Sequence, residues 1–343
     1  MAERIRELDG LRAIAVASVV IFHAYGENAL AGGYLGVDIF FVISGYIITR
    51  ILLREHRQTG GISLKGFYLR RMRRIWPALT VLLATVVVVE TVRMAISEGT
   101  FASDTFILAL ASIAGVMNWI RAFEHSGGGI LGHIWSLAVE EQFYLLWPPL
   151  LVFCLRFQNR SATPVIPVII LAILLWRTFL VLSGAPPERT YNGLDTRADA
   201  LLIGCCFALR EGGNPFSATR MAGFGAASCI LLAMLAFVSW TSAFMNSAGF
   251  TIAALCAAFW VAETASPHRL TTQTLGARPM VWLGLRSYSL YLWHYPVIVW
   301  MNMTDLPHGV AMPLAILISL VMADLSYRFV ELGVRSRPLP PGA

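Results

Sequence analysis

Eleven apolar runs dominate this sequence and restrict the chain to one kind of fold. They lie at 8–24, 35–53, 75–92, 105–120, 134–155, 164–182, 197–209, 221–240, 248–262, 283–301 and 310–330. Of the 343 residues, 57% are hydrophobic and only 13% are charged. A helix needs about 20 apolar residues to cross a hydrocarbon core of about 30 Å, and in lipid its backbone groups must bond to one another. We therefore expect an all-α, polytopic membrane helix bundle and not a soluble domain.

The distribution of basic residues predicts the orientation of these helices. Lys and Arg collect in cytoplasmic loops. If every run except 105–120 crosses the membrane, 21 of the 26 Lys and Arg residues lie on the side of the N-terminus. Gly115 and Asn118 interrupt the excluded run. We predict about ten transmembrane helices, one re-entrant or interfacial helix at 105–120, and both termini in the cytoplasm. The expected location is the inner (cytoplasmic) membrane, as a multi-pass protein.

The first run is expected to be a retained span, because Glu3, Glu7 and Asp9 do not fit the basic start of a signal peptide. The five cysteines lie inside apolar runs and form no C-x-x-C pair, so we expect no disulfide framework and no metal site. We predict one domain over residues 1–333, followed by a short cytoplasmic tail at 334–343.

Arg12 and His23 are the first candidate site residues, in the stretch LDGLRAIAVASVVIFHA. On a helix they lie roughly 16 Å apart, about half of a hydrocarbon core of roughly 30 Å. If Arg12 is at one membrane face, His23 is near the midplane, where an ionisable group is costly and indicates a functional site. The alternative is a neutral imidazole that is hydrogen-bonded to a neighbouring helix.

Six more polar residues fall at a similar depth to His23 in the predicted topology. They are Asp38, Glu140, Glu141, Arg197, Asp199 and His294. Their convergence predicts one water-accessible cavity in the outer half of the membrane. There an imidazole can accept a proton, a carboxylate can fix its tautomer, and a buried arginine can stabilise an oxyanion. We expect His23 to be the general base and Asp38 to orient it, with Glu141, or its neighbour Glu140, as the competing carboxylate.

A basic cluster precedes the third predicted span, in FYLRRMRRIWP. It consists of Arg70, Arg71, Arg73 and Arg74. Such a cluster is often only a topology signal that contacts lipid phosphates. However, guanidinium groups also bind phosphates bidentately, and residues three or four apart share a helix face. An anion site inside and an acid/base cavity outside together fit coenzyme A, whose long arm would carry a thioester to His23.

Six segments, in this order, resemble acyltransferase family 3, whose integral membrane enzymes O-acylate surface polysaccharides, peptidoglycan and some secreted glycosides. They are LDGLRAIAVASVVIFHA, GYLGVDIFFVISGYII, FYLRRMRRIWP, HIWSLAVEEQFYLLWP, TRADALLIG and SYSLYLWHYPV. The resemblance implies a ten-span domain, an acyl-CoA donor, His23 as the essential catalytic residue, and functional arginines at Arg12 and Arg70–Arg74. Many members also carry a C-terminal extracytoplasmic hydrolase-like domain. Here only about a dozen residues follow the last predicted span, so we expect a stand-alone form that transfers directly or through a partner. Leu332 and Gly333 depart from the family's closing pattern and leave the end of the last helix open.

The expected function is transfer of an acyl group, with acetyl as the default in this family, from cytoplasmic acyl-CoA to a sugar hydroxyl of a surface polysaccharide, lipid-linked glycan or glycoside. We assign His23, Asp38 and Glu141 to catalysis, and Arg12, Arg70, Arg71 and Arg74 to the donor. Glu140, Arg197, Asp199 and His294 are assigned to the substrate. Membrane lipids are expected partners; no nucleic acid and no metal are expected. The alternatives are a transporter of a glycan or organic anion, and a non-catalytic sensor or scaffold. The arginine cluster has no counterpart in the second half of the sequence, and no internal repeat is seen; both observations argue against a transporter.

Overall fold

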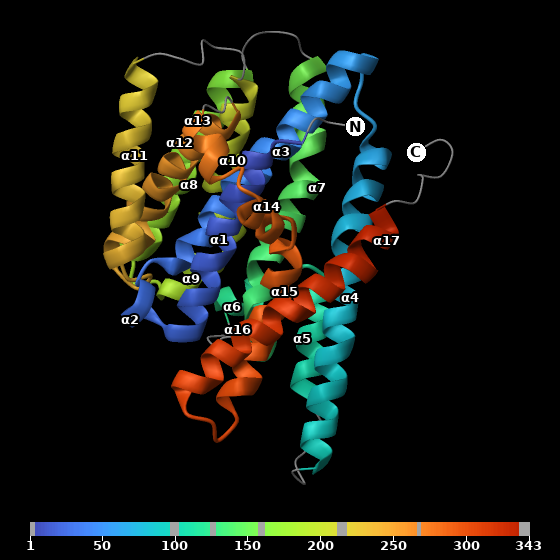
Figure 1. The fold of residues 1–343 in the computed structure, drawn as a ribbon. Helices are drawn as coiled ribbons and strands as arrows, with labels where there is room; N and C mark the ends of the chain where they lie inside the picture. Colours follow the sequence, from blue (N-terminus) through green and yellow to red (C-terminus); the bar gives the residue numbers. More distant parts are fainter. Residues whose placement is uncertain are drawn as a thin grey trace. The chain divides into compact units, whose positions relative to one another are not determined.

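The computed structural model describes residues 4–96, 103–123, 128–156, 162–210, 218–265 and 269–335. These residues form helices and no strand, which confirms the all-α prediction (Figure 1). The chain divides into two compact units, which are described separately below. The first contains residues 1–62 and 139–285, and the second contains residues 63–138 and 286–343. The single domain predicted for residues 1–333 stays a prediction, and residues 336–343 of the predicted tail lie outside the described residues.

The predicted apolar runs correspond to helices. In the part of the chain that is described, six stretches are long and apolar enough to cross a membrane: Arg6–Tyr25, Gly33–Thr59, Leu64–Ile96, Val165–Leu182, Met245–Thr264 and His308–Val334. Four other predicted spans coincide with helices that are shorter or more polar: α7 (Trp135–Arg156), α10 (Leu194–Leu209), α11 (Ala218–Phe237) and α15 (Ser287–Asn302). The number of ten spans and the cytoplasmic termini therefore stay predictions.

The 105–120 run is broken where the sequence predicted an interruption. It forms α5 (Ser103–Ile113) and α6 (Met117–Phe123), and between them Gly115 has a positive φ of 65°. At about 1.5 Å per residue, α5 is about 16 Å long, too short for a hydrocarbon core of about 30 Å.

The first unit is built around α3 (Gly36–Thr59). The other described elements of the unit are α1 (Arg6–Tyr25), α2 (Glu27–Leu30), η1 (Gly33–Leu35), α7 from Val139 onward, α8 (Ala162–Leu182), α9 (Pro187–Asn192), α10, α11, the π-helix η3 (Met245–Gly249), α12 (Phe250–Ala265), α13 (Arg269–Thr274) and α14 (Arg278–Leu285). α3 packs on α10 backbone to backbone (Figure 1). A Cβ at Gly45 would collide with the Leu201 carbonyl oxygen, and one at Gly204 would collide with the Val42 carbonyl oxygen. This close approach requires glycine at both positions.

Hydrogen bonds fix the direction of α10 and α7 relative to α3. Asp38 meets Arg197 near the start of α3 and α10, and the later residues of the same helices, including Ala208, line one pocket. On α7, Glu140 accepts from Ser44 at 2.6 Å, and Trp147 donates to Thr49 at 2.9 Å. α3, α7 and α10 therefore run in the same direction, as the ten-span prediction requires of these three helices.

The second unit contains α4 (Leu64–Ile96), α5, α6, η2 (Gly129–Ile134), α15, α16 (His308–Leu325), the π-helix η4 (Ser326–Glu331) and α17 (Leu332–Arg335). α4 and α15 run parallel, because Tyr288 donates to the Ile75 carbonyl at 2.7 Å and Trp300 donates to Glu90 at 2.8 Å. The last helix continues through the π-turn, where buried Glu331 accepts from Ser289, and it is described as far as Arg335.

Candidate active site

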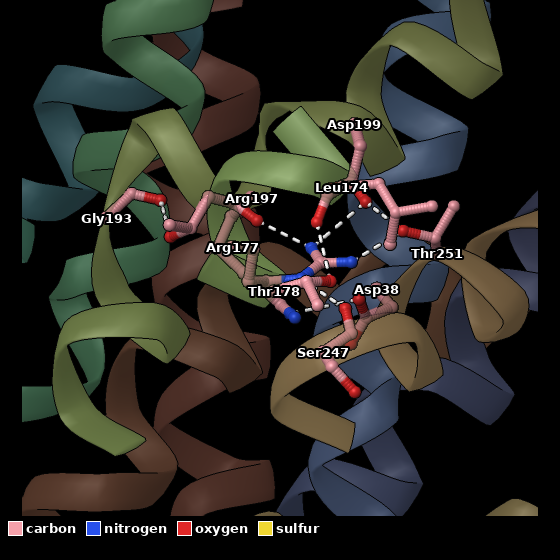
Figure 2. Close-up of polar contacts among 10 residues, drawn as sticks. Asp38, Leu174, Arg177, Thr178, Gly193, Arg197, Asp199, Ser247 and Thr251 are labelled. Atoms are coloured by element: carbon pink, nitrogen blue, oxygen red, sulfur yellow. Dashed lines mark hydrogen bonds and ion pairs between the residues drawn. The ribbon is translucent and has the colours of Figure 1, made fainter. Parts of the chain in front are cut away.

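Two buried ion pairs connect three helices of the first unit (Figure 2). Arg197 on α10 donates through Nη2 to Oδ1 of Asp38 on α3 at 2.9 Å. Arg177 on α8 donates through Nη1 to Oδ2 of Asp199 on α10 at 3.0 Å. Each of the four side chains is at most 1% exposed. Sequence reasoning placed Asp38, Arg197 and Asp199 at one depth, and the structure brings these three residues together.

Arg177 is almost completely hydrogen-bonded in this network. Besides the bond to Asp199, Nη1 donates to the Thr196 carbonyl at 2.6 Å and Nε donates to the Ser247 carbonyl at 2.8 Å. Its Nη2 donates to the Thr251 hydroxyl at 2.5 Å, and that hydroxyl donates to Asp199 at 2.6 Å. A buried charge is tolerated when it is paired and hydrogen-bonded in this way. Arg177 therefore ties α8 to α10, η3 and α12.

Arg197, in contrast, has donors to spare. Its guanidinium lies over the Phe250 ring, 3.7 Å from the ring centroid, and 5.2 Å from that of Tyr191. In the described part of the chain, neither Nε nor Nη1 of Arg197 has a hydrogen-bond partner, nor does Oδ2 of Asp38, although all three atoms are buried. A buried polar atom that stays without a hydrogen bond destabilises the fold by about 1–3 kcal/mol. These atoms can therefore bind a hydroxyl, a carbonyl or an imidazole that is presented to them.

His23 lies in the last turn of α1. It is half-buried, and its ring makes an edge contact with Phe22 at a centroid distance of 5.6 Å. Phe22 in turn contacts Tyr34 at 5.6 Å, and Tyr34 contacts Phe250 at 6.2 Å. An aromatic layer thus leads from the neighbour of His23 to the ring beneath Arg197. The role of Asp38 as the carboxylate that orients His23 stays a prediction, because the polar partner that the structure gives Asp38 is Arg197.

The two adjacent glutamates of α7 have different surroundings. Glu140 accepts hydrogen bonds from Ser44 at 2.6 Å and from Tyr144 at 2.9 Å. Oε1 of Glu141 is buried, and among the described residues it has no hydrogen-bond partner. Because Ser44 is six residues after Asp38 on α3, Glu140 lies roughly 9 Å further along that helix. Oε1 of Glu141 could therefore accept a hydrogen bond from a substrate or a catalytic group, and the catalytic role of Glu141 stays a prediction.

The predicted donor arginines lie in both units. Arg12 is half-buried on α1 of the first unit. The cluster at Arg70–Arg74 lies on α4 of the second unit, where Arg70 is exposed and Arg71 lies over the Phe67 ring at 5.7 Å from its centroid. Arg73 and Arg74 are half-buried, as is Arg71, and the binding of this cluster to a donor stays a prediction.

His294 lies in the second unit and is not placed relative to the six residues of the first. It is fully buried on α15, and its Nδ1–H donates to the Tyr291 carbonyl at 2.7 Å. His133 lies 5.6 Å away between ring centroids, and its Nε2–H donates to the Leu292 carbonyl at 3.0 Å. The single cavity predicted for all seven polar residues stays a prediction.

Sequence reasoning missed Arg177 and His133. Arg177 was counted only as one of the few basic residues outside the cytoplasm, yet it interrupts an otherwise apolar run, and a charge inside a span indicates a functional or structural site. His133 begins the motif HIWSLAVEEQFYLLWP, where no spacing to another titratable residue distinguished it. Within the described ranges, no group of three His, Cys, Asp or Glu side chains is placed to hold a metal ion.

Comparison with known proteins identifies the class of this chain. Residues 5–325 match the family model described as "Acyltransferase domain". The chain therefore belongs to this acyltransferase family, which confirms the resemblance found in the sequence.

Two curated relatives illustrate the similarity. The chain is 35% identical to the "Peptidoglycan O-acetyltransferase OatA" of Listeria monocytogenes over 96% of its own length and 55% of that protein. It is 34% identical to the "O-acetyltransferase OatA" of Staphylococcus aureus over 96% of its own length and 57% of that protein. The chain thus spans little more than half the length of these relatives. No solved structure matches it.

Proposed function

We propose that this chain is a membrane O-acyltransferase that moves an acyl group, acetyl in the first instance, from cytoplasmic acyl-CoA to a sugar hydroxyl of a cell-surface glycan. The observation that carries the proposal is the similarity, along 96% of the chain, to proteins named O-acetyltransferases, one of them for peptidoglycan. Peptidoglycan is accordingly the first acceptor to test. The proposed setting is the inner membrane, crossed ten times, with both termini in the cytoplasm.

Two sets of arginines are proposed to hold the donor. Arg12 on α1 and Arg70, Arg71 and Arg74 on α4 would bind the phosphates of acyl-CoA, because guanidinium forks match phosphate oxygens. The exposure of Arg70 supports this role, since bulky phosphates need accessible donors, and Arg71 and Arg74 are only partly buried.

His23 is proposed as the general base. A sugar hydroxyl is a poor nucleophile at neutral pH, so His23 would accept its proton as the oxygen attacks the thioester carbonyl. A C–O bond forms, the C–S bond breaks, and the departing thiolate takes the proton from the imidazolium. Imidazole, with a reference pKa of about 6.5, suits both steps. Asp38 supports this assignment, because its Oδ2 is buried without a partner in the described part of the chain and can accept from a ring N–H.

The substrate roles are proposed for groups with capacity left to bind. The two unsatisfied donors of Arg197 suit the oxyanion that forms at the thioester carbonyl, or an acceptor hydroxyl. Asp199, which is occupied by Arg177 and Thr251, would act on the substrate only by holding α10 in place. Glu140 and His294 complete the proposed substrate set, and Glu141 is proposed as the third catalytic residue, beside His23 and Asp38.

Acyl transfer by the purified chain tests the proposal directly. The chain would be reconstituted in liposomes with radiolabelled acetyl-CoA and a peptidoglycan-derived oligosaccharide, and the acceptor analysed by mass spectrometry. We expect acetylated oligosaccharide from wild type and none from His23→Ala. The control is His56→Ala, which changes a histidine in the last turn of α3 and should leave acetylation unchanged. Movement of a glycan across the membrane without acylation would favour a transporter and refute the proposal.

A further inference from the structure

A pocket of about 330 Å³ lies at the C-terminal end of α3, and none of the roles above uses it. Its lining comes from two helices: Arg50, Leu53, Arg54, Arg57 and Gln58 of α3, and Ala208 of α10. All six residues belong to the first unit.

The pocket follows from how the two helices end. α3 and α10 are held together at Gly45 and Gly204, but α10 ends at Leu209 whereas α3 continues to Thr59. Ala208, the last buried residue of α10, has only a methyl side chain. The final turns of α3 therefore extend past a short side chain, and the long arginine side chains enclose the space beside it.

Three arginines share the face of α3 that borders this space. Arg50, Arg54 and Arg57 are spaced i, i+4 and i+7, which places them on one side of a helix. Among the described residues, those that line the pocket include no carboxylate, and Arg54 and Arg57 are exposed. Like charges at this spacing repel one another. A topology signal alone would not require a shared face, because charge on any side of the helix biases orientation equally.

We propose that this pocket binds a phosphoryl anion. Three guanidinium groups around one space offer bidentate donors for the oxygens of a phosphate or pyrophosphate, and Gln58 adds a neutral donor. Leu53 and Ala208 supply an apolar floor for a carbon group attached to the phosphate. The anion is either the headgroup of an anionic lipid or a soluble phosphate compound. This inference does not rest on the proposed acyl transfer, because it concerns binding alone.

The test compares wild type with Arg54→Gln/Arg57→Gln, two exposed substitutions at the end of a helix. Arg156→Gln is the matched control, because Arg156 is an exposed arginine at the end of α7 and does not line the pocket. The full chain is measured in phosphatidylcholine nanodiscs at about 0.15 M salt, where diffuse charge attraction is screened beyond about 8 Å. Equal melting temperatures establish that the variants are folded. Arg54→Lys/Arg57→Lys keeps the charge and removes the guanidinium fork.

One arm titrates inorganic pyrophosphate by calorimetry, and the other measures retention of phosphatidylglycerol from mixed nanodiscs by native mass spectrometry. We expect the double glutamine variant to bind one of these probes about ten- to a hundredfold more weakly than wild type does. The affinity of the double lysine variant should lie between those of wild type and the glutamine variant. Loss of pyrophosphate binding identifies a soluble ligand, and loss of phosphatidylglycerol identifies a lipid headgroup. The proposal is overturned if neither probe distinguishes the double variant from wild type, or if Arg156→Gln weakens binding equally.

Discussion

Arg177→Met should destabilise the chain far more than the loss of a surface ion pair. Arg177 and Asp199 are 3.0 Å apart and at most 1% exposed. With an effective dielectric constant of about 20, their attraction at this distance is about 5 kcal/mol. Part of this attraction offsets desolvation in the native pair. Removing one partner leaves Asp199 charged and buried, which costs about 3–5 kcal/mol. Methionine keeps an unbranched apolar side chain, so the volume lost is small.

Arg189→Met is the matched control. Arg189 and Asp195 lie 2.5 Å apart in the same unit, but the two side chains are 12% and 34% exposed. A pair that solvent reaches contributes about 0–1 kcal/mol. The two variants remove the same charge. They differ in the burial of the carboxylate left behind and in the hydrogen bonds to Thr196, Ser247 and Thr251 that only Arg177→Met removes.

The measurement is the free energy of unfolding in mixed micelles, as sodium dodecyl sulfate is added and tryptophan fluorescence is followed. Arg177→Met/Asp199→Leu should regain more than half of the loss, because replacing both partners of a buried pair by apolar groups is often nearly neutral. The coupling energy between the two sites should then be about 2 kcal/mol or more. The ion pair contributes less than expected if Arg177→Met lowers the free energy of unfolding no more than Arg189→Met does. The same holds if the effects of Arg177→Met and Asp199→Leu simply add in the double variant.

Three further predictions concern topology, donor and chemistry. In a cysteine-free background, Asn28→Cys should react with a membrane-impermeant thiol reagent in intact cells and Gln58→Cys should not; the opposite pattern would reverse the orientation. Arg71→Ala and Arg74→Ala should each weaken acetyl-CoA binding by ten- to a hundredfold, about 1.5–3 kcal/mol, with only partial rescue by lysine; unchanged affinities would leave a topology signal alone. His23→Ala should abolish transfer and retain donor binding; a folded variant with a tenth of wild-type turnover would exclude His23 as the general base.

The positions of the helices could be predicted from the sequence because they depend on length and apolar content. The interruption at Gly115 could also be predicted, because a glycine close to a polar residue breaks the pattern of an apolar run. The common level of Asp38 and Arg197 followed from counting residues along the spans, and their hydrogen bond agrees with it.

The sequence did not predict which polar side chains at this depth pair with one another. Which side chains meet depends on how each helix is rotated about its axis. The polar residues of α10 (Asp195, Thr196, Arg197 and Asp199) point in several directions around its first turns, so no single polar face reveals its rotation. Asp38 was assigned to His23 by nearness along the chain, and that assignment stays a prediction; the ion pair of Asp38 with Arg197 was not foreseen. Arg177 was missed because its partners come from α10, η3 and α12, which lie 19 to 74 residues away in the sequence.

The energetics of the two ion pairs indicate what the network contributes. Buried ion pairs stabilise a fold little more than well-packed apolar side chains would, so stability alone does not explain two of them within three residues of α10. Their distinct hydrogen bonding gives a better explanation. Arg177, which is almost completely hydrogen-bonded, holds α8, α10 and α12 in one arrangement. Arg197 and Asp38 then keep unsatisfied atoms at the end of the unit where His23 lies. The first pair supplies rigidity, and under the proposed function the second pair would offer the rigid polar atoms that binding and proton transfer require.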